Sequence, residues 1–231
     1  MNLLPAIESL RQKRPVFHSE ADFQFALAWE IKQLYDDAEI RLEVPSNTSI
    51  KGRVDIVVRH EGAVFPIELK YIKKMQSFLV HDERFNLVDG VHDMDMHDCI
   101  KDIARLETFQ AEMEGFSAGY ALWLTNDPAY WDSEYDAAYY CEFHAPHTSL
   151  KTGTMSFKPG SKMSSHPQYG CPITLKGSYT VFWNDYYDHG VKNGLFRYAL
   201  IDVSGKGPSV IQETADLSMS AYCKWDTSNR G

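Results

Sequence analysis

The chain has 231 residues and a mass of 26.4 kDa, which fits one domain or one domain with an elaborated end. Apolar residues make up 44% and charged residues 24%, so we expect a buried core that needs no disulfide or structural metal. The sequence contains no run of apolar residues long enough to span a membrane, no signal-peptide pattern and no CxxC pair, which indicates a cytoplasmic protein with reduced cysteines. A formal charge of −9 argues against a general nucleic-acid coat.

Two helices are expected at the start of the chain. Residues 1–15 have the pattern of a short helix that ends in a basic segment. Ser19 then stands as an N-cap with Asp22 three residues later, and apolar residues recur behind it at helical spacing. Residues 20–36 are therefore predicted to form a second helix with one apolar face. Glu20, in its first turn, places a carboxylate at the edge of that face.

The next elements are predicted strands. Residues 40–44 alternate apolar and charged side chains, and residues 53–59 and 63–72 form two further strands joined by a tight turn at 60–63. Residues 78–95 are polar and read as irregular chain. The later predicted elements are a helix at 98–113 and strands at 120–125, 180–186 and 195–203.

The composition changes beyond residue 130. We expect residues 1–130 to form a core and residues 131–231 a C-terminal β-rich extension packed on it. Residues 143–184 contain four lysines and no acid, and they are rich in Ser, Thr, Gly and Pro. A long basic loop or hairpin is therefore expected there. The aromatic residues between 130 and 140 fit a core or an oligomer interface, such as that of a homodimer.

Asp55, Glu68 and Lys70 are the residues that indicate chemistry. If Glu61 and Gly62 are the turn residues, the residue numbers of cross-strand pairs sum to 123, and Asp55 faces Glu68 with Cβ atoms about 5 Å apart. Lys70, two residues further on, points to the same face. A bulge at Pro66 would shift this register by one residue.

A metal ion would resolve the repulsion between two such close carboxylates. Asp55 and Glu68 are predicted to bind Mg²⁺, which Mn²⁺ can replace, with the carbonyl oxygen of Leu69 as a further ligand. Lys70 would position a water molecule and help to deprotonate it, or stabilise charge that builds on a phosphorus atom. A nearby cation would lower the pKa of Lys70 and the carboxylates would raise it, and the sequence leaves open which effect is larger.

An Asp followed about a dozen residues later by Glu-x-Lys resembles the PD-(D/E)XK, or restriction-endonuclease-like, nuclease superfamily, and the order of elements agrees over residues 17–125. The resemblance implies an α/β core with a mixed sheet flanked by helices, and metal-dependent hydrolysis of phosphodiester bonds, with DNA as the expected substrate. It also implies that Glu20 joins the metal shell. Val54 stands where the name-giving motif has proline. The core helix would add a polar residue from among Asp98, Lys101 and Asp102.

Phosphate contacts are predicted for five lysines: Lys73, Lys74, Lys151, Lys158 and Lys162. The alternative for residues 143–184 is a surface insertion without a ligand. A rival function is a non-catalytic module that binds nucleic acid or protein through this interval. A second rival is a Zn²⁺ or Mn²⁺ hydrolase built on the histidines and acids of residues 81–98, for which the alternative is a solvated acidic loop.

Overall fold

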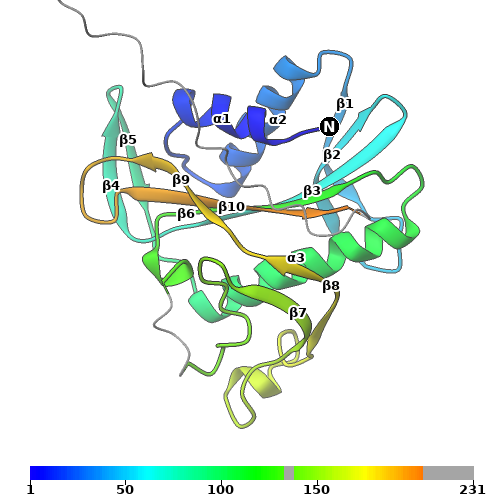
Figure 1. The fold of residues 1–231 in the computed structure, drawn as a ribbon. Coiled ribbons are helices and arrows are strands. Elements are labelled where there is room, and N and C mark those ends of the chain that lie inside the picture. The colour runs from blue at the N-terminus through cyan, green and yellow to red at the C-terminus, as the bar shows by residue number, and fades with distance from the viewer. Residues whose placement is uncertain (133–137, 205–231) are drawn as a thin grey trace, which may run out of the picture.

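The computed structural model describes residues 1–132 and 138–204, and its centre is a mixed six-stranded sheet (Figure 1). The strand order is β1-β2-β3-β6-β10-β9, and every neighbouring pair is antiparallel except β3 and β6, which are parallel. The strands of this sheet are β1 (Glu39–Pro45), β2 (Arg53–His60), β3 (Ala63–Ile72), β6 (Gly119–Thr125), β9 (Trp183–Asp188) and β10 (Leu195–Val203).

Helices cover both faces of this sheet. α1 (Leu4–Lys13) and α2 (Glu20–Leu34) lie on one face, and α3 (His92–Glu112) lies on the other, within the crossover that parallel strands require (Figure 1). Each face has its own cluster of buried apolar side chains, so the protein is a three-layer α/β structure. All seven residues of β6, at the middle of the sheet, are buried.

Two hairpins lie outside the main sheet. β4 (Gln76–Val80) pairs with β5 (Glu83–Leu87), and β7 (Leu150–Met155) pairs with β8 (Ile173–Thr180). The first hairpin packs Phe78 on His189, with ring centroids 4.3 Å apart. The second packs on α3, where the buried Glu107 accepts hydrogen bonds from the β8 backbone and from Tyr179.

The structure confirms the predicted N-terminal elements. The Ser19 hydroxyl accepts a 3.1 Å hydrogen bond from the Asp22 backbone N–H, which caps α2 as expected. The strands predicted at 40–44, 53–59, 63–72, 120–125 and 195–203 all form, with bounds within one or two residues.

The prediction for residues 78–95 was wrong. This segment contains most of the β4–β5 hairpin, which turns at His81 and Asp82 with positive φ, and the first residues of α3. α3 begins at His92 rather than at Asp98 because Asp93 and Asp95 lie in its first turn, where negative charge is favourable. Acidic residues are common in loops, but these two lie at the start of a helix.

The C-terminal part of the chain completes the central sheet. β10 pairs with the whole of β6, and β9 pairs with β10. Residues on both sides of the predicted boundary at 130 therefore share one sheet. The strand predicted at 180–186 is divided, since β8 ends at Thr180 and β9 begins at Trp183. Residues 143–184 form a hairpin with a long connection, one of the two expected forms. Residues 133–137 and 205–231 of the predicted extension lie outside the described residues.

In the part of the chain that the structure describes, no helix has both the length and the apolar character to cross a lipid bilayer. Among the described residues, Cys99, Cys141 and Cys171 are free thiols.

Candidate active site

The β2–β3 hairpin has the predicted register. Paired residue numbers sum to 123 from His60 and Ala63 to Ile56 and Ile67, so Pro66 introduces no bulge. Beyond Ile56 and Ile67 the strands separate, because β3 continues alongside β6 while β2 continues alongside β1. The prediction that Asp55 directly faces Glu68 across the hairpin was therefore wrong. Both residues lie where the two strands diverge.

The Asp55 carboxylate turns toward the backbone of β3. Its Oδ2 accepts a 2.6 Å hydrogen bond from the N–H of Leu69. From α2, Gln24 donates to the carbonyl oxygen of Asp55 at 2.6 Å and to Glu43 at 3.0 Å. Glu20, one helical turn before Gln24, accepts a 2.9 Å hydrogen bond from the N–H of Tyr71 through Oε2. The first turns of α2 thus hold both strands at the point where they separate.

α3 contributes the other half of the site. Asp102 lies 2.9 Å from the Lys70 ammonium, and the Arg105 Nε donates a 2.9 Å hydrogen bond to Glu68 Oε1. Asp102 and Arg105 are three positions apart, which puts both on the face of α3 that covers β3. Glu68 and Asp102 are buried, with 3% and 6% of their surface exposed.

The cluster therefore contains four carboxylates, Glu20, Asp55, Glu68 and Asp102, and two cationic groups, Lys70 and Arg105. Fully ionised, this set carries an excess of two negative charges. Burial raises the pKa of all four acids, and for Glu68 the neighbouring Asp102 and Asp55 raise it further while Arg105 lowers it. The full set of charges is thus unfavourable without a further cation or bound protons.

Lys70 is the group whose protonation the sequence left open. Burial lowers the pKa of Lys70, but the carboxylates of Asp102 and Glu20 outweigh it, so the pKa is raised. Lys70 is therefore an ammonium group at neutral pH. In that form it can neutralise negative charge and orient a ligand, and it does not accept a proton from water.

Most predicted metal ligands lie together, yet they do not form a ready ligand set. No group of three or more His, Cys, Asp or Glu residues is placed to hold a metal ion within residues 1–132 and 138–204. Glu20, Asp55 and Glu68 each use one carboxylate oxygen in the hydrogen bonds given above. The carbonyl oxygen of Leu69 accepts a 3.1 Å hydrogen bond from the Lys70 ammonium. Binding of a cation by Glu68 and Leu69 would thus require Arg105 and Lys70 to shift.

Lys151 was wrongly predicted to contact nucleic acid. It is 7% exposed and donates hydrogen bonds to the carbonyl oxygens of Glu142 and His144, so it cannot reach a phosphate outside the protein.

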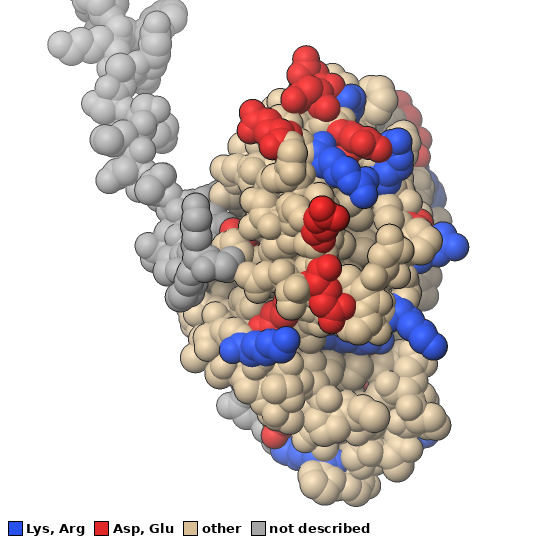
Figure 2. All heavy atoms as spheres, turned by 90° about the vertical axis from the view of Figure 1, so that its right-hand side faces the viewer, with Lys and Arg blue, Asp and Glu red and all other residues tan. Residues whose placement is uncertain are grey.

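The other four predicted contacts lie nearer the surface. Lys158 and Lys162 are exposed in the β7–β8 connection, and Lys73 and Lys74 are half-buried after β3, with the Lys74 ammonium 3.6 Å from Asp127. On the side that carries the β2–β3 hairpin, acidic and basic side chains are interspersed (Figure 2).

The histidines and acids of residues 81–98 do not form one site. His81 lies in the β4–β5 turn, whereas His92 contacts Asp127 at 2.6 Å and the buried His97 stacks on Phe157. The solvated acidic loop expected over residues 81–98 was wrong for residues 92–98, which form the first turns of α3. His18 contacts Glu83 and stacks on Phe85.

The sequence reasoning missed Arg105 and Gln24. Both lie on buried or half-buried helix faces among apolar residues, and a polar residue in such a position is the pattern that could have identified them. Asp102 was one of three residues considered on its helix. Asp98 instead contacts His97.

The chain matches no protein-family model and no curated protein, and its structure matches no solved structure.

Proposed function

We propose that this protein is a metal-dependent nuclease with a restriction-endonuclease-like core that hydrolyses phosphodiester bonds of DNA. One observation carries the proposal: Asp55, Glu68 and Lys70, with Glu20 from a separate helix, converge where β2 and β3 separate. Buried groups with displaced pKa values gathered at one place are typical of catalytic sites.

Asp55 and Glu68 are the proposed ligands of Mg²⁺ or Mn²⁺, assisted by Glu20. A divalent cation matches the excess of two negative charges in the cluster, and it would supply a Lewis acid for the phosphate and a more acidic water. The fit is one of charge and donor type, since oxygen ligands suit a hard cation.

Lys70 and Arg105 are proposed to bind the substrate phosphate. Asp102 holds the Lys70 ammonium in place at 2.9 Å, so that its charge opposes the negative charge that develops on phosphate oxygens. Arg105 carries a planar guanidinium suited to phosphate, and its hydrogen bond to Glu68 places it at the same point. Lys158 and Lys162 are proposed to contact the DNA backbone further away.

A non-catalytic binding module is the second candidate. The ion pairs Lys70–Asp102 and Arg105–Glu68 favour it, because they satisfy buried charges within the protein itself. Such a module would bind nucleic acid or protein independently of Asp55 and Glu68.

A cleavage assay separates the two candidates. Supercoiled plasmid, linear duplex DNA, single-stranded DNA and RNA are incubated with Mg²⁺, Mn²⁺ or EDTA, and calorimetry measures metal binding. We expect metal-dependent cleavage that Asp55→Asn and Glu68→Gln abolish and that Glu61→Gln, in the exposed turn of the same hairpin, leaves intact. Absence of cleavage on every substrate, together with absence of metal binding, would refute the nuclease proposal.

A further inference from the structure

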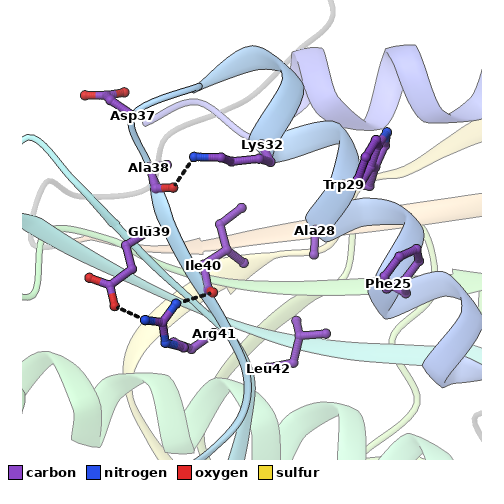
Figure 3. A pocket seen from close by; sticks show the side chains of 10 residues that line it. All are labelled: Phe25, Ala28, Trp29, Lys32, Asp37, Ala38, Glu39, Ile40, Arg41 and Leu42. Carbon is purple, nitrogen blue, oxygen red and sulfur yellow. Dashed lines mark hydrogen bonds and ion pairs between the residues drawn. The ribbon is translucent and has the colours of Figure 1, made fainter.

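A hollow lies between α2 and β1, on the side of the sheet that α1 and α2 cover (Figure 3). Phe25 and Trp29 project from α2 on one side of it, and Ile40 and Leu42 of β1 lie on the other. Phe25 is 60% exposed and Trp29 57% exposed, and Leu42 is also exposed. Large apolar side chains gathered in this way are typical of a surface that binds another protein.

The same two aromatic residues border a second hollow. It lies toward α1 and includes Leu10 and the apolar stems of Lys13 and Arg14. Phe25 and Trp29 therefore form a ridge with a hollow on each side. An equivalent ridge on another molecule can fit into one of these hollows.

β1 ends the six-stranded sheet at this surface. Its one neighbour in the described sheet is β2, and Glu39, Arg41 and Leu42 are exposed. An edge strand of this kind carries backbone N–H and C=O groups that another strand can pair with.

We propose that a second copy of this chain pairs its β1 with this β1, antiparallel, about a twofold axis at Ile40. Ile40 then faces Ile40 of the second copy. Glu39 faces Arg41 of the second copy, and Arg41 faces its Glu39. Within each copy the Arg41 guanidinium lies 2.7 Å from Glu39. Pairing of the strands about a twofold axis brings each of these groups next to its opposite charge on the second copy as well.

The axis keeps α2 of both copies on the same side of a continuous sheet. Ile40 packs against the core cluster on that side, and the ridges of Phe25 and Trp29 then lie beside the axis. Pairing of the strands and burial of the aromatic ridges would hold the dimer together.

Other registers are less favourable. An axis at Arg41 would place the two Arg41 side chains against each other and Glu39 against Glu43. An axis at Leu42 would place Glu39 against Pro45, which has no N–H, and would pair Arg41 with Glu43. Glu43 has a φ of 53° and a carboxylate bonded to Gln24, so the strand is irregular there. The axis at Ile40 uses the regular part of β1.

Sedimentation velocity of the full chain tests the dimer between about 1 and 100 μM, the range in which moderate interfaces assemble. We expect a species of twice 26.4 kDa. Arg41→Glu and Glu39→Arg each create like-charge pairs and should raise the dissociation constant at least about tenfold, whereas the double variant Glu39→Arg/Arg41→Glu should restore it. Arg84→Glu, the same charge change on exposed β5, is the control.

A second pair of variants tests the aromatic ridge. Trp29→Ser should weaken the dimer, and Leu79→Ser, which removes another exposed apolar side chain on β4, should not. A monomer at every concentration would overturn the proposal. This is also the result expected if the hollow binds a strand of a different protein. A dimer that resists both Arg41→Glu and Trp29→Ser, or one that the charge exchange fails to restore, would overturn it equally. None of these measurements depends on cleavage activity.

Discussion

Two buried lysines, Lys70 and Lys151, lie in different electrostatic surroundings. The Lys70 ammonium contacts the carboxylate of Asp102, and its pKa is raised. Lys151 donates to two backbone carbonyl oxygens, and burial lowers its pKa to about 8 in spite of the nearby Glu142. Burial penalises both charges, and a carboxylate compensates for this more fully than carbonyl groups do. Lys70 is therefore a fixed positive charge beside the candidate site, whereas Lys151 ties the start of β7 to the preceding turn.

The largest expected difference between the two lysines is in catalysis. Lys70→Met should lower DNA cleavage by at least about a thousandfold, because a positive charge at the proposed phosphate site is lost. Lys151→Met should leave cleavage within about twofold at a temperature where the protein is folded. Turnover is measured on the preferred DNA substrate, with circular dichroism to confirm folding.

The charge-balanced variant Lys70→Met/Asp102→Asn separates catalysis from stability. It should recover folding stability and remain inactive. An active double variant would remove Lys70 from the mechanism.

The ion pair beside Lys70 should give the next largest effect. Arg105→Ala leaves the buried Glu68 carboxylate without its partner and should lower the free energy of unfolding by about 3 kcal/mol or more. Lys101→Ala, on the same helix, should change it by less than about 0.5 kcal/mol. Urea denaturation at neutral pH measures both variants. Combining Arg105→Ala with Glu68→Gln should recover part of the loss, and equal losses in the single and double variants would show that the pair contributes little.

Lys151 should give a smaller effect that depends on pH. Its folded pKa of about 8 lies below the ordinary lysine value, so between the two values the unfolded chain holds a proton that the folded chain has released. The contribution of Lys151 to the free energy of unfolding therefore rises with pH across that window, by about 3 kcal/mol at most.

The measurement compares the wild-type protein with Lys151→Met by urea denaturation at about pH 7.5 and about pH 10. The wild-type protein should gain stability relative to the variant at the higher pH. Parallel behaviour of the two proteins would mean that Lys151 is charged with an ordinary pKa.

The hairpin of β2 and β3 was predictable because its information is local. The turn at Glu61 and Gly62 fixes the register from the His60–Ala63 pair to the Ile56–Ile67 pair, and Asp55 and Glu68 come directly after the last pair. The ion pairs of Asp102 and Arg105 depend instead on how α3 crosses the sheet, and no short sequence pattern encodes that crossing. The prediction that Lys151 contacts nucleic acid was wrong for a related reason. A lysine in a basic, polar interval is expected at the surface, and the burial of Lys151 depends on the packing of β7 on the core.

The position of β10 between β6 and β9 bears on the order in which the protein can be made. Every residue of the candidate site has left the ribosome long before β10, yet β6 beside that site has no partner on its other edge until β10 arrives. A nascent chain or a truncated product that ends before Leu195 would thus present a strand of largely apolar residues with an open edge. Such an edge can pair with other chains, so the protein is open to aggregation at β6 until β10 is made and covers that edge.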